Sequence, residues 1–195
     1  MESAADWVIL GLGNPGPEYE STPHNLGFLA ADRLAVRNSI RISRPDSQAL
    51  VGIGVIAGSR VVVAKPQTYM NLSGQSVQGL LHFYKIPLEN LIIAHDDLDI
   101  SFGTLRIRPT GGPGGQRGMA NTIEQLGTKD FPRLRMGIGR PPGRMDPKDY
   151  VLQDFSKDEL KLMPDLLSRA SDAVLEFVMR GLNAAMNKFN GDIRE

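Results

Sequence analysis

The chain has 195 residues, no cysteine, and 22 acidic and 22 basic residues. This length suits one domain with a sizeable core, and the lack of cysteine excludes disulfides, a thiolate nucleophile and a zinc–thiolate site. No run of about 18 apolar residues predicts a membrane span, and the N-terminus lacks the basic and apolar regions of a secretory signal. We therefore expect a soluble, cytoplasmic protein that forms a single domain over residues 1–195.

Short runs rich in β-branched residues predict strands, and helical patterns separate several of them. The predicted strands are 7–12, 50–57, 60–65, 91–94, 104–108 and 133–138. Strands that alternate with helices predict an α/β fold, here a mixed, mostly parallel twisted sheet flanked by helices. The turn at Gly58-Ser59 predicts a hairpin, which makes the sheet mixed.

The C-terminal segment is expected to be helical. Ser156 and Glu159 match a capping box. An apolar stripe follows, made of Leu160, Met163, Leu167, Ala170, Val174 and Phe177. Pro164 interrupts this stripe, so we expect a short turn and then a longer C-terminal helix with Pro164 at its first position.

The glycine-rich turn at residues 11–16 matches G-x-G-x-x-G, a dinucleotide-binding pattern. Pro15 and Pro17 remove amide donors that a bound pyrophosphate needs. The acidic residue expected about 20 positions later at the end of a strand is also missing. These departures argue against NAD or FAD, and we predict no cofactor.

The same turn leads to three polar side chains, Asn14, Tyr19 and His24, just past a predicted strand end. Open α/β sheets bind their ligands at this place. His24 is the side chain best suited to exchange a proton near neutral pH. This segment is therefore the first candidate site.

Two further strand ends carry candidate residues. Asn71 stands between a strand and an amphipathic helix, so it is either the helix N-cap or an amide that shares a cleft with Asn14 and orients a carbonyl or an oxyanion. Asp96 ends a buried strand amid the acids of residues 95–99. This cluster suggests a metal site, but no second carboxylate cluster accompanies it. The alternative is that Asp96 accepts a hydrogen bond from an imidazole, and strand alternation points His95 elsewhere.

The middle of the chain is basic and contains a glycine-rich loop. Residues 101–148 hold nine basic and three acidic residues, an excess of six positive charges. Such an excess suggests an anionic partner such as a nucleic-acid backbone, unless these are ordinary solvated residues. The loop at residues 111–115 precedes a predicted helix, so it cradles a phosphate, hinges a lid or is simply flexible.

Read together, these segments resemble the bacterial-type peptidyl-tRNA hydrolase family over nearly the whole chain. The resemblance is carried by residues 11–16, Tyr19, and residues 24–28, 66–74, 95–99, 111–115 and 131–141. It implies hydrolysis of the ester between a peptide and the 3′ ribose of tRNA, which releases the peptide and recycles the tRNA.

The resemblance also implies roles for individual residues. His24 would activate the water and Asp96 would orient His24. Asn71 would position the carbonyl or the water, and Asn14 would help to distinguish N-blocked peptidyl-tRNA from free aminoacyl-tRNA.

For the rest of the substrate, the resemblance implies that Tyr19 and Tyr69 line the cleft. Arg108, Arg135 and Arg144 stand where the family has basic residues near the tRNA backbone, including its 5′ phosphate. The resemblance implies no metal, and we expect a monomer that binds the tRNA acceptor end.

Two positions depart from the family pattern at the head of the lid helix. Gln116 and Arg117 replace a His-Asn pair, and both are expected to contact substrate. Gln116 still donates and accepts hydrogen bonds, whereas Arg117 can grip a phosphate but cannot accept. Pro113 also replaces a common histidine, and Pro23 a common arginine.

These departures leave one alternative function open, a non-catalytic RNA-binding relative on the same scaffold, similar to organellar splicing factors. The presence of both His24 and Asp96 favours the enzyme.

Overall fold

The fold is built on one eight-stranded mixed sheet with the strand order β2-β3-β4-β1-β5-β7-β6-β8. The computed structural model describes residues 4–195, so residues 1–3 of the predicted domain lie outside the described part. The strands are β1 (Trp7–Gly11), β2 (Arg44–Asp46), β3 (Ala49–Ile56), β4 (Ser59–Pro66), β5 (Leu91–Asp97), β6 (Thr104–Arg108), β7 (Arg133–Gly137) and β8 (Gly191–Asp192).

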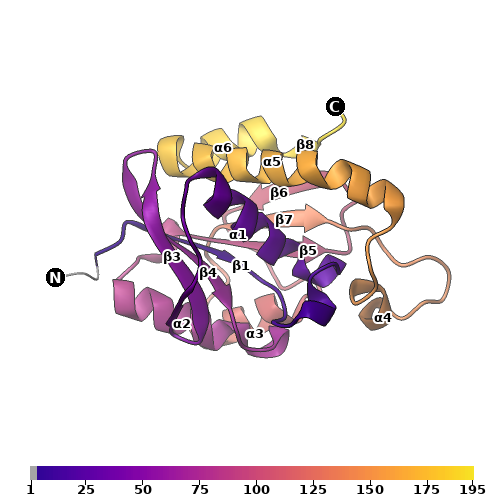
Figure 1. The fold of residues 1–195 in the computed structure, drawn as a ribbon, viewed down its shortest axis with the longest axis horizontal. Helices are drawn as coiled ribbons and strands as arrows, with labels where there is room; N and C mark the ends of the chain where they lie inside the picture. Colours follow the sequence, from indigo (N-terminus) through magenta and orange to yellow (C-terminus); the bar gives the residue numbers. More distant parts are fainter. Residues whose placement is uncertain (1–3) are drawn as a thin grey trace.

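Within the described residues, six α-helices and four short 3₁₀ turns connect these strands (Figure 1). The helices are α1 (Leu26–Arg37), α2 (Ser73–Tyr84), α3 (Arg117–Leu126), α4 (Pro147–Val151), α5 (Lys157–Arg180) and α6 (Leu182–Phe189). The 3₁₀ turns are η1 (Pro17–Tyr19), η2 (Pro23–Asn25), η3 (Met70–Leu72) and η4 (Leu88–Asn90).

Parallel pairing is confined to the four central strands, β4, β1, β5 and β7. Antiparallel strands extend both edges, which confirms the mixed sheet. The predicted hairpin joins β3 to β4. Its two turn residues, Ala57 and Gly58, both have positive φ, as the tightest hairpin turns require. The two outermost strands, β2 and β8, were not predicted, because two or three residues are too few to show a period.

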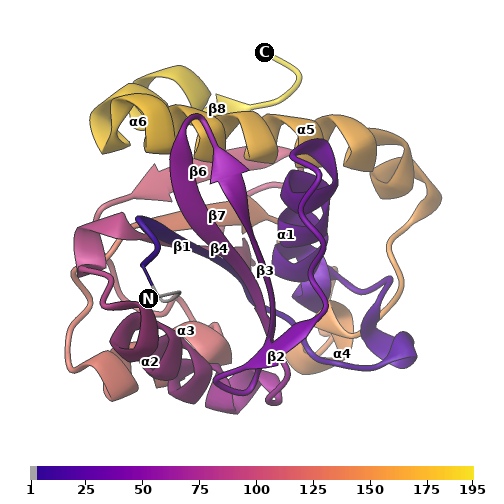
Figure 2. The same cartoon turned by 60° about the vertical axis from the view of Figure 1, so that its left-hand side comes forward.

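Helices cover both faces of the sheet and bury a separate apolar cluster on each. Helices α1, α5 and α6 lie over one face, and α2 and α3 lie over the other (Figures 1 and 2). Successive residues of β1 serve the two clusters in turn, since Ile9 packs in the first and Val8 and Leu10 pack in the second. Burial on both faces explains why the central strands are apolar throughout.

Helix α5 corrects the prediction for the C-terminal segment. The Ser156–Glu159 capping box is present, but the helix runs through Pro164 without a break, so the predicted restart there is wrong. Proline removes one hydrogen bond to Leu160, and Leu160 is half exposed rather than in the buried stripe. Packing of the remaining stripe, Met163, Ala170, Val174 and Phe177, outweighs that loss. Neither α5 nor another helix in the described chain is long and apolar enough to cross a membrane.

Candidate active site

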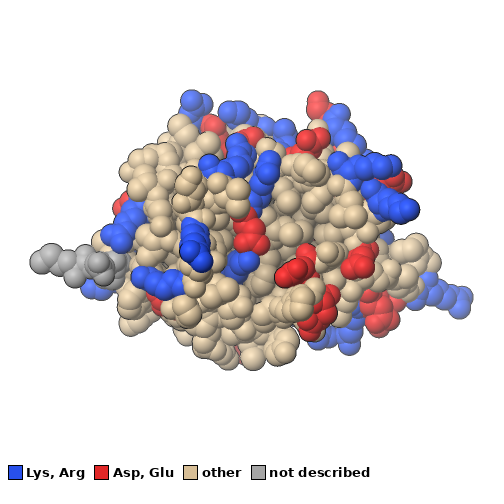
Figure 3. All heavy atoms as spheres, in the orientation of Figure 1, with Lys and Arg blue, Asp and Glu red and all other residues tan. Residues whose placement is uncertain are grey.

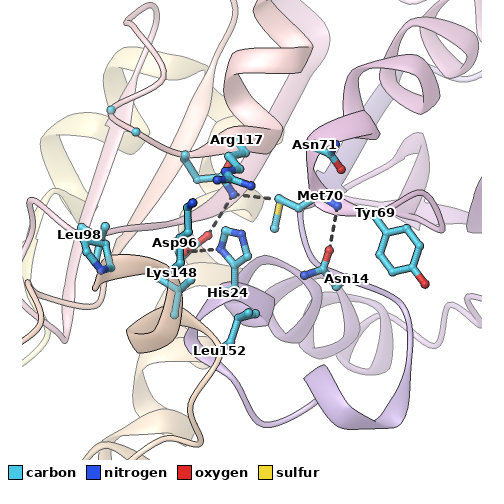
Figure 4. A pocket seen from close by; sticks show the side chains of 15 residues that line it. Asn14, His24, Tyr69, Met70, Asn71, Asp96, Leu98, Arg117, Lys148 and Leu152 are labelled. Atoms are coloured by element: carbon cyan, nitrogen blue, oxygen red, sulfur yellow. Dashed lines mark hydrogen bonds and ion pairs between the residues drawn. The ribbon is translucent and has the colours of Figure 1, made fainter. Parts of the chain in front are cut away.

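The candidate site is a cavity of about 300 Å³ at the carboxyl ends of the central parallel strands. The segment after β1 brings Asn14, the segment after β4 brings Tyr69 and Asn71, and β5 brings Asp96 (Figure 4). Turn η2 adds His24. Adjacent parallel strands end at the same edge of a sheet, so residues far apart in the sequence meet there.

A histidine–aspartate pair forms the floor of this cavity. His24 Nδ1 lies 2.9 Å from Asp96 Oδ2, and the two side chains are 12% and 2% exposed. Because a carboxylate only accepts hydrogen bonds, Nδ1 of the imidazole donates, which leaves Nε2 as the basic nitrogen. The predicted contact between these two residues is confirmed.

The pKa of His24 lies above its ordinary value of 6.5. Burial is the largest single influence and lowers this pKa, since it penalises the charged imidazolium. The charge of Asp96 and its hydrogen bond together outweigh burial and raise the pKa, while the charge of Arg117 lowers it. The imidazole is therefore a stronger base than its burial alone would allow.

Gln116 supports the pair from the start of α3. Its Nε2 donates to Asp96 Oδ1 over 3.1 Å, and its Oε1 accepts from Met119 N over 2.7 Å, which caps the helix. The side chain is only 6% exposed. Gln116 was expected to contact substrate. It does line the cavity, but both ends of its amide are bonded within the protein.

The orientation of the Asn14 amide is set by its neighbours. Its Oδ1 accepts from Met70 N over 2.8 Å, so its NH₂ group is the end left for the cavity. The backbone of Asn14 is held by Asn25, whose side chain accepts from Asn14 N and donates to Asn14 O. Sequence reasoning missed Asn25, although it stands beside His24 within a quoted family segment.

A close helix–strand contact holds η2 and His24 in place. Helix α1 packs so tightly against the turn after β1 that a Cβ on Gly27 would lie 2.5 Å from Leu12 N. A Cβ on Gly11 would lie 2.0 Å from the Gly27 carbonyl oxygen. Only glycine fits at these two positions, and this explains part of the glycine-rich pattern in the first candidate segment.

Asn71 is not a helix cap. It lies in η3, helix α2 starts after Leu72, and no side chain caps that helix. Asn71 is exposed and lines the cavity, as does Tyr69, which is 62% exposed. Tyr19 in η1 was expected to line the cleft as well, but it is not among the residues of the cavity wall.

Two of the predicted tRNA-binding arginines lie on neighbouring strands. Arg108 on β6 and Arg135 on β7 belong to an antiparallel pair in which Arg106 faces Arg135 directly. These side chains share one face of the sheet. Arg135 Nε donates to Asp97 Oδ2 over 2.7 Å. Arg144 is exposed in the loop before α4 and lies outside the cavity wall.

Other cations of the basic segment are already engaged. Arg133 is 1% exposed and donates to the carbonyls of Gly111, Gly112, Lys129 and Phe131, so it ties the glycine loop to β7. Burial lowers its pKa to about 10. Arg140 pairs with Asp99. Asp97 and Asp99, which lie outside the segment, thus offset part of its excess of six positive charges. Basic and acidic side chains also occur together over the face of the molecule shown in Figure 3.

The acids of residues 95–99 do not converge on one point. Asp96 bonds to His24, Asp97 to Arg135 and Asp99 to Arg140. Within residues 4–195 no group of three or more His, Asp or Glu side chains could hold a metal ion. Of the two roles considered for Asp96, the structure shows the contact with an imidazole, that of His24.

The chain is similar to known proteins over almost its whole length. The family model described as peptidyl-tRNA hydrolase matches residues 8–195. A peptidyl-tRNA hydrolase of Chloroflexus aurantiacus is 51% identical over 94% of this chain and 98% of its own length. One of Alkaliphilus metalliredigens is 48% identical over 95% of this chain and 100% of its own.

Solved structures agree with the sequence comparisons. The Arg119Gln mutant of the Acinetobacter baumannii peptidyl-tRNA hydrolase superposes with a TM-score of 0.90 at 36% identity, over 99% of both chains. The unmutated enzyme of that organism gives 0.88 at 35% identity, over 97% of this chain and 98% of its own. With matches of this extent in sequence and in fold, the chain belongs to the peptidyl-tRNA hydrolase family.

Proposed function

We propose that this chain hydrolyses the ester between the peptide and the 3′ ribose of peptidyl-tRNA, with His24 as the general base. The family match supports the hydrolase class and the substrate. The single observation that carries the assignment to residues is the hydrogen bond between His24 and Asp96 in a cavity with two asparagine amides.

The reaction needs one water and no covalent intermediate on the protein. His24 Nε2 takes a proton from a water about 3 Å away as the water oxygen attacks the ester carbonyl carbon. The tetrahedral intermediate then expels the ribose 3′ oxygen, which takes the proton back from the imidazolium. Asp96 keeps the imidazole in the productive tautomer and stabilises its charged form. General-base help of this kind is worth about 10²–10⁴-fold.

The two asparagines orient the carbonyl group. The NH₂ group of Asn14 is held toward the cavity by the Met70 N–H at its other end. The exposed amide of Asn71 lies in the same wall. Amide donors that face the carbonyl oxygen stabilise the negative charge that develops on it. Asn14 also serves to recognise the amide of an N-blocked substrate.

The tRNA acceptor end is bound outside the cavity. Arg108 and Arg135 contact the backbone and its 5′ phosphate, and Arg144 reaches it from the loop before α4. Tyr69 supplies an aromatic surface in the cavity wall, and Tyr19 contacts the substrate outside that wall. The enzyme acts as a monomer in the cytoplasm.

The test is hydrolysis of an N-acetylated aminoacyl-tRNA by the wild type and by His24→Ala. We expect cleavage by the wild type and a loss of at least about 10²-fold in the variant. The control is Tyr84→Phe, at a buried residue that ends α2 and does not line the cavity. Binding of the tRNA without cleavage by the wild type would contradict the proposal and indicate an RNA-binding protein.

A further inference from the structure

The cavity wall carries an excess of positive charge. Its charged side chains besides His24 are one carboxylate, Asp96, and two cations, Arg117 and Lys148. Asp96 is buried and bonded to His24 and Gln116. Arg117 and Lys148 are exposed and have no hydrogen bond or ion pair through their side chains in the described chain. Figure 4 shows them entering the pocket from two different elements, α3 and α4.

Apart from Asp96, no described acid of the elements that pack around the cavity lies in its wall to offset these cations. Asp97 and Asp99 are paired with arginines of their own. Asp146 caps α4 by accepting from the Lys148 backbone N–H, and neither it nor Asp149 lines the cavity. Helix α2 and turn η3, which pack against α3, contain no acidic residue.

The position of Arg117 in α3 points to a role outside the helix. It is the first residue of that helix, where the helix dipole disfavours a cation. Its side chain forms no capping contact and lies in the cavity wall instead. Its charge reaches the reacting centre, since it lowers the pKa of His24.

The substrate carries its own charge close to that centre. In an aminoacyl ester the amino nitrogen is two bonds from the carbonyl carbon that the water attacks. A free amino group is an ammonium ion below its pKa of about 7.7–8.0, whereas an acylated one is neutral. The two substrate classes therefore differ by one positive charge placed within a few ångströms of His24.

We propose that Arg117 and Lys148 are specificity-determining residues that reject substrates with a free α-ammonium group by charge repulsion. This rests on the function proposed above. In a partly solvated site, repulsion acting within a Debye length of about 8 Å makes each cation disfavour the ammonium substrate about three- to tenfold. Hydrogen bonding by Asn14 adds a second selection that does not depend on the charge.

The experiment compares three esters of one tRNA: N-acetylaminoacyl, aminoacyl, and 2-hydroxyacyl, in which a hydroxyl replaces the amino group. The readout is the ratio of kcat/KM for the hydroxyacyl ester to that for the aminoacyl ester, from about pH 6 to about pH 8.5, across the amine pKa. Ionisations of the enzyme, including that of His24, cancel in this ratio. The variants are Arg117→Gln, Lys148→Gln, the double variant and Arg117→Lys, with Lys157→Gln on α5 as the control outside the cavity.

For the wild type we expect a high ratio at low pH that falls as the ammonium loses its proton. Each glutamine variant should lower the low-pH ratio about three- to tenfold, the double variant more, while Arg117→Lys and Lys157→Gln keep it. If the glutamine variants weaken both esters equally and leave the ratio unchanged, the cations bind phosphate and the proposal is wrong. Failure of the wild type to cleave the N-acetylated ester would overturn the proposed function itself.

Discussion

At the residue scale, the reactivity of the site depends on one contact between side chains 72 positions apart. Burial by itself would make His24 a weak base, because the buried imidazolium loses its hydration. Asp96 supplies the opposing charge at 2.9 Å and selects the tautomer whose Nε2 is free to act. One carboxylate therefore raises the pKa of the base and determines which of its two nitrogens accepts the proton.

This leads to a prediction for Asp96→Asn. An amide can bond to the imidazole in the wrong tautomer, so kcat/KM should fall about 10²–10⁴-fold. In the wild type, kcat/KM should rise as the pH passes upward through the His24 pKa, which lies above 6.5. The variant loses the influences that raise this pKa and keeps burial, so its midpoint should move to lower pH.

The measurement is a pH–rate profile for an N-blocked substrate, with circular dichroism to check the fold. An Asp96→Asn variant with the wild-type rate and midpoint would exclude the orienting role.

At the element scale, the first turn of α3 joins the helix to the catalytic pair. The same side chain that caps the helix also holds the second oxygen of Asp96. A helix N-terminus needs such a cap, because its first amide groups have no partner within the helix. The placement of α3 and the rotamer of Asp96 are thus coupled through one buried amide.

Replacing Gln116 with Leu should therefore affect stability and rate together. The helix loses its cap and Asp96 loses a donor, so we expect a loss of about 1–3 kcal/mol in the free energy of unfolding. We also expect a shift in the pH–rate midpoint, because Asp96 is less restrained. Urea unfolding and the pH profile measure the two effects.

The matched control is Asn121→Ala, which removes the hydrogen bond from Gly74 N to Asn121 Oδ1 and so weakens the contact of α3 with α2 without touching Asp96. It should lower stability but keep the midpoint. Equal midpoints in the two variants would show that Gln116 is purely structural.

At the scale of the whole molecule, the sheet separates the chemistry from the proposed tRNA contacts. The cavity lies at the ends of the central strands, while Arg108 stands on β6, beyond β7 toward one edge of the sheet. The net charge of zero conceals this arrangement. Several arginines form ion pairs with acids of the chain. The positive charge near this edge of the sheet therefore comes from a few side chains, among them Arg108 and Arg106.

Salt dependence tests this arrangement. Arg108→Gln should weaken tRNA binding and reduce the slope of log K against log salt by about one, as expected for one lost phosphate contact. Arg41→Gln, at the opposite edge of the sheet before β2, is the control and should leave the slope unchanged. Filter binding over a range of salt concentrations gives both slopes, and equal slopes would place the tRNA elsewhere.

Structural features that depend on short stretches of sequence could be predicted. The β3–β4 hairpin, the central strands and the Ser156 cap follow from local periods and turn chemistry. His24 and Asp96 were also predictable, because they lie within the family segments, next to the ends of predicted strands. The predicted restart of the helix at Pro164 is wrong, because packing of a long apolar face outweighs one lost hydrogen bond.

The sequence by itself determined the fold class, the family and the identity of the proposed base and its partner. Only the tertiary structure decided which polar groups are bonded to each other: Gln116 to Asp96, Asn25 to Asn14, and Arg135 to Asp97. It also decided which cations are left facing the cavity. These outcomes depend on contacts between segments distant in the chain, and hydrogen bonds and charges act through distances in space that no local pattern records.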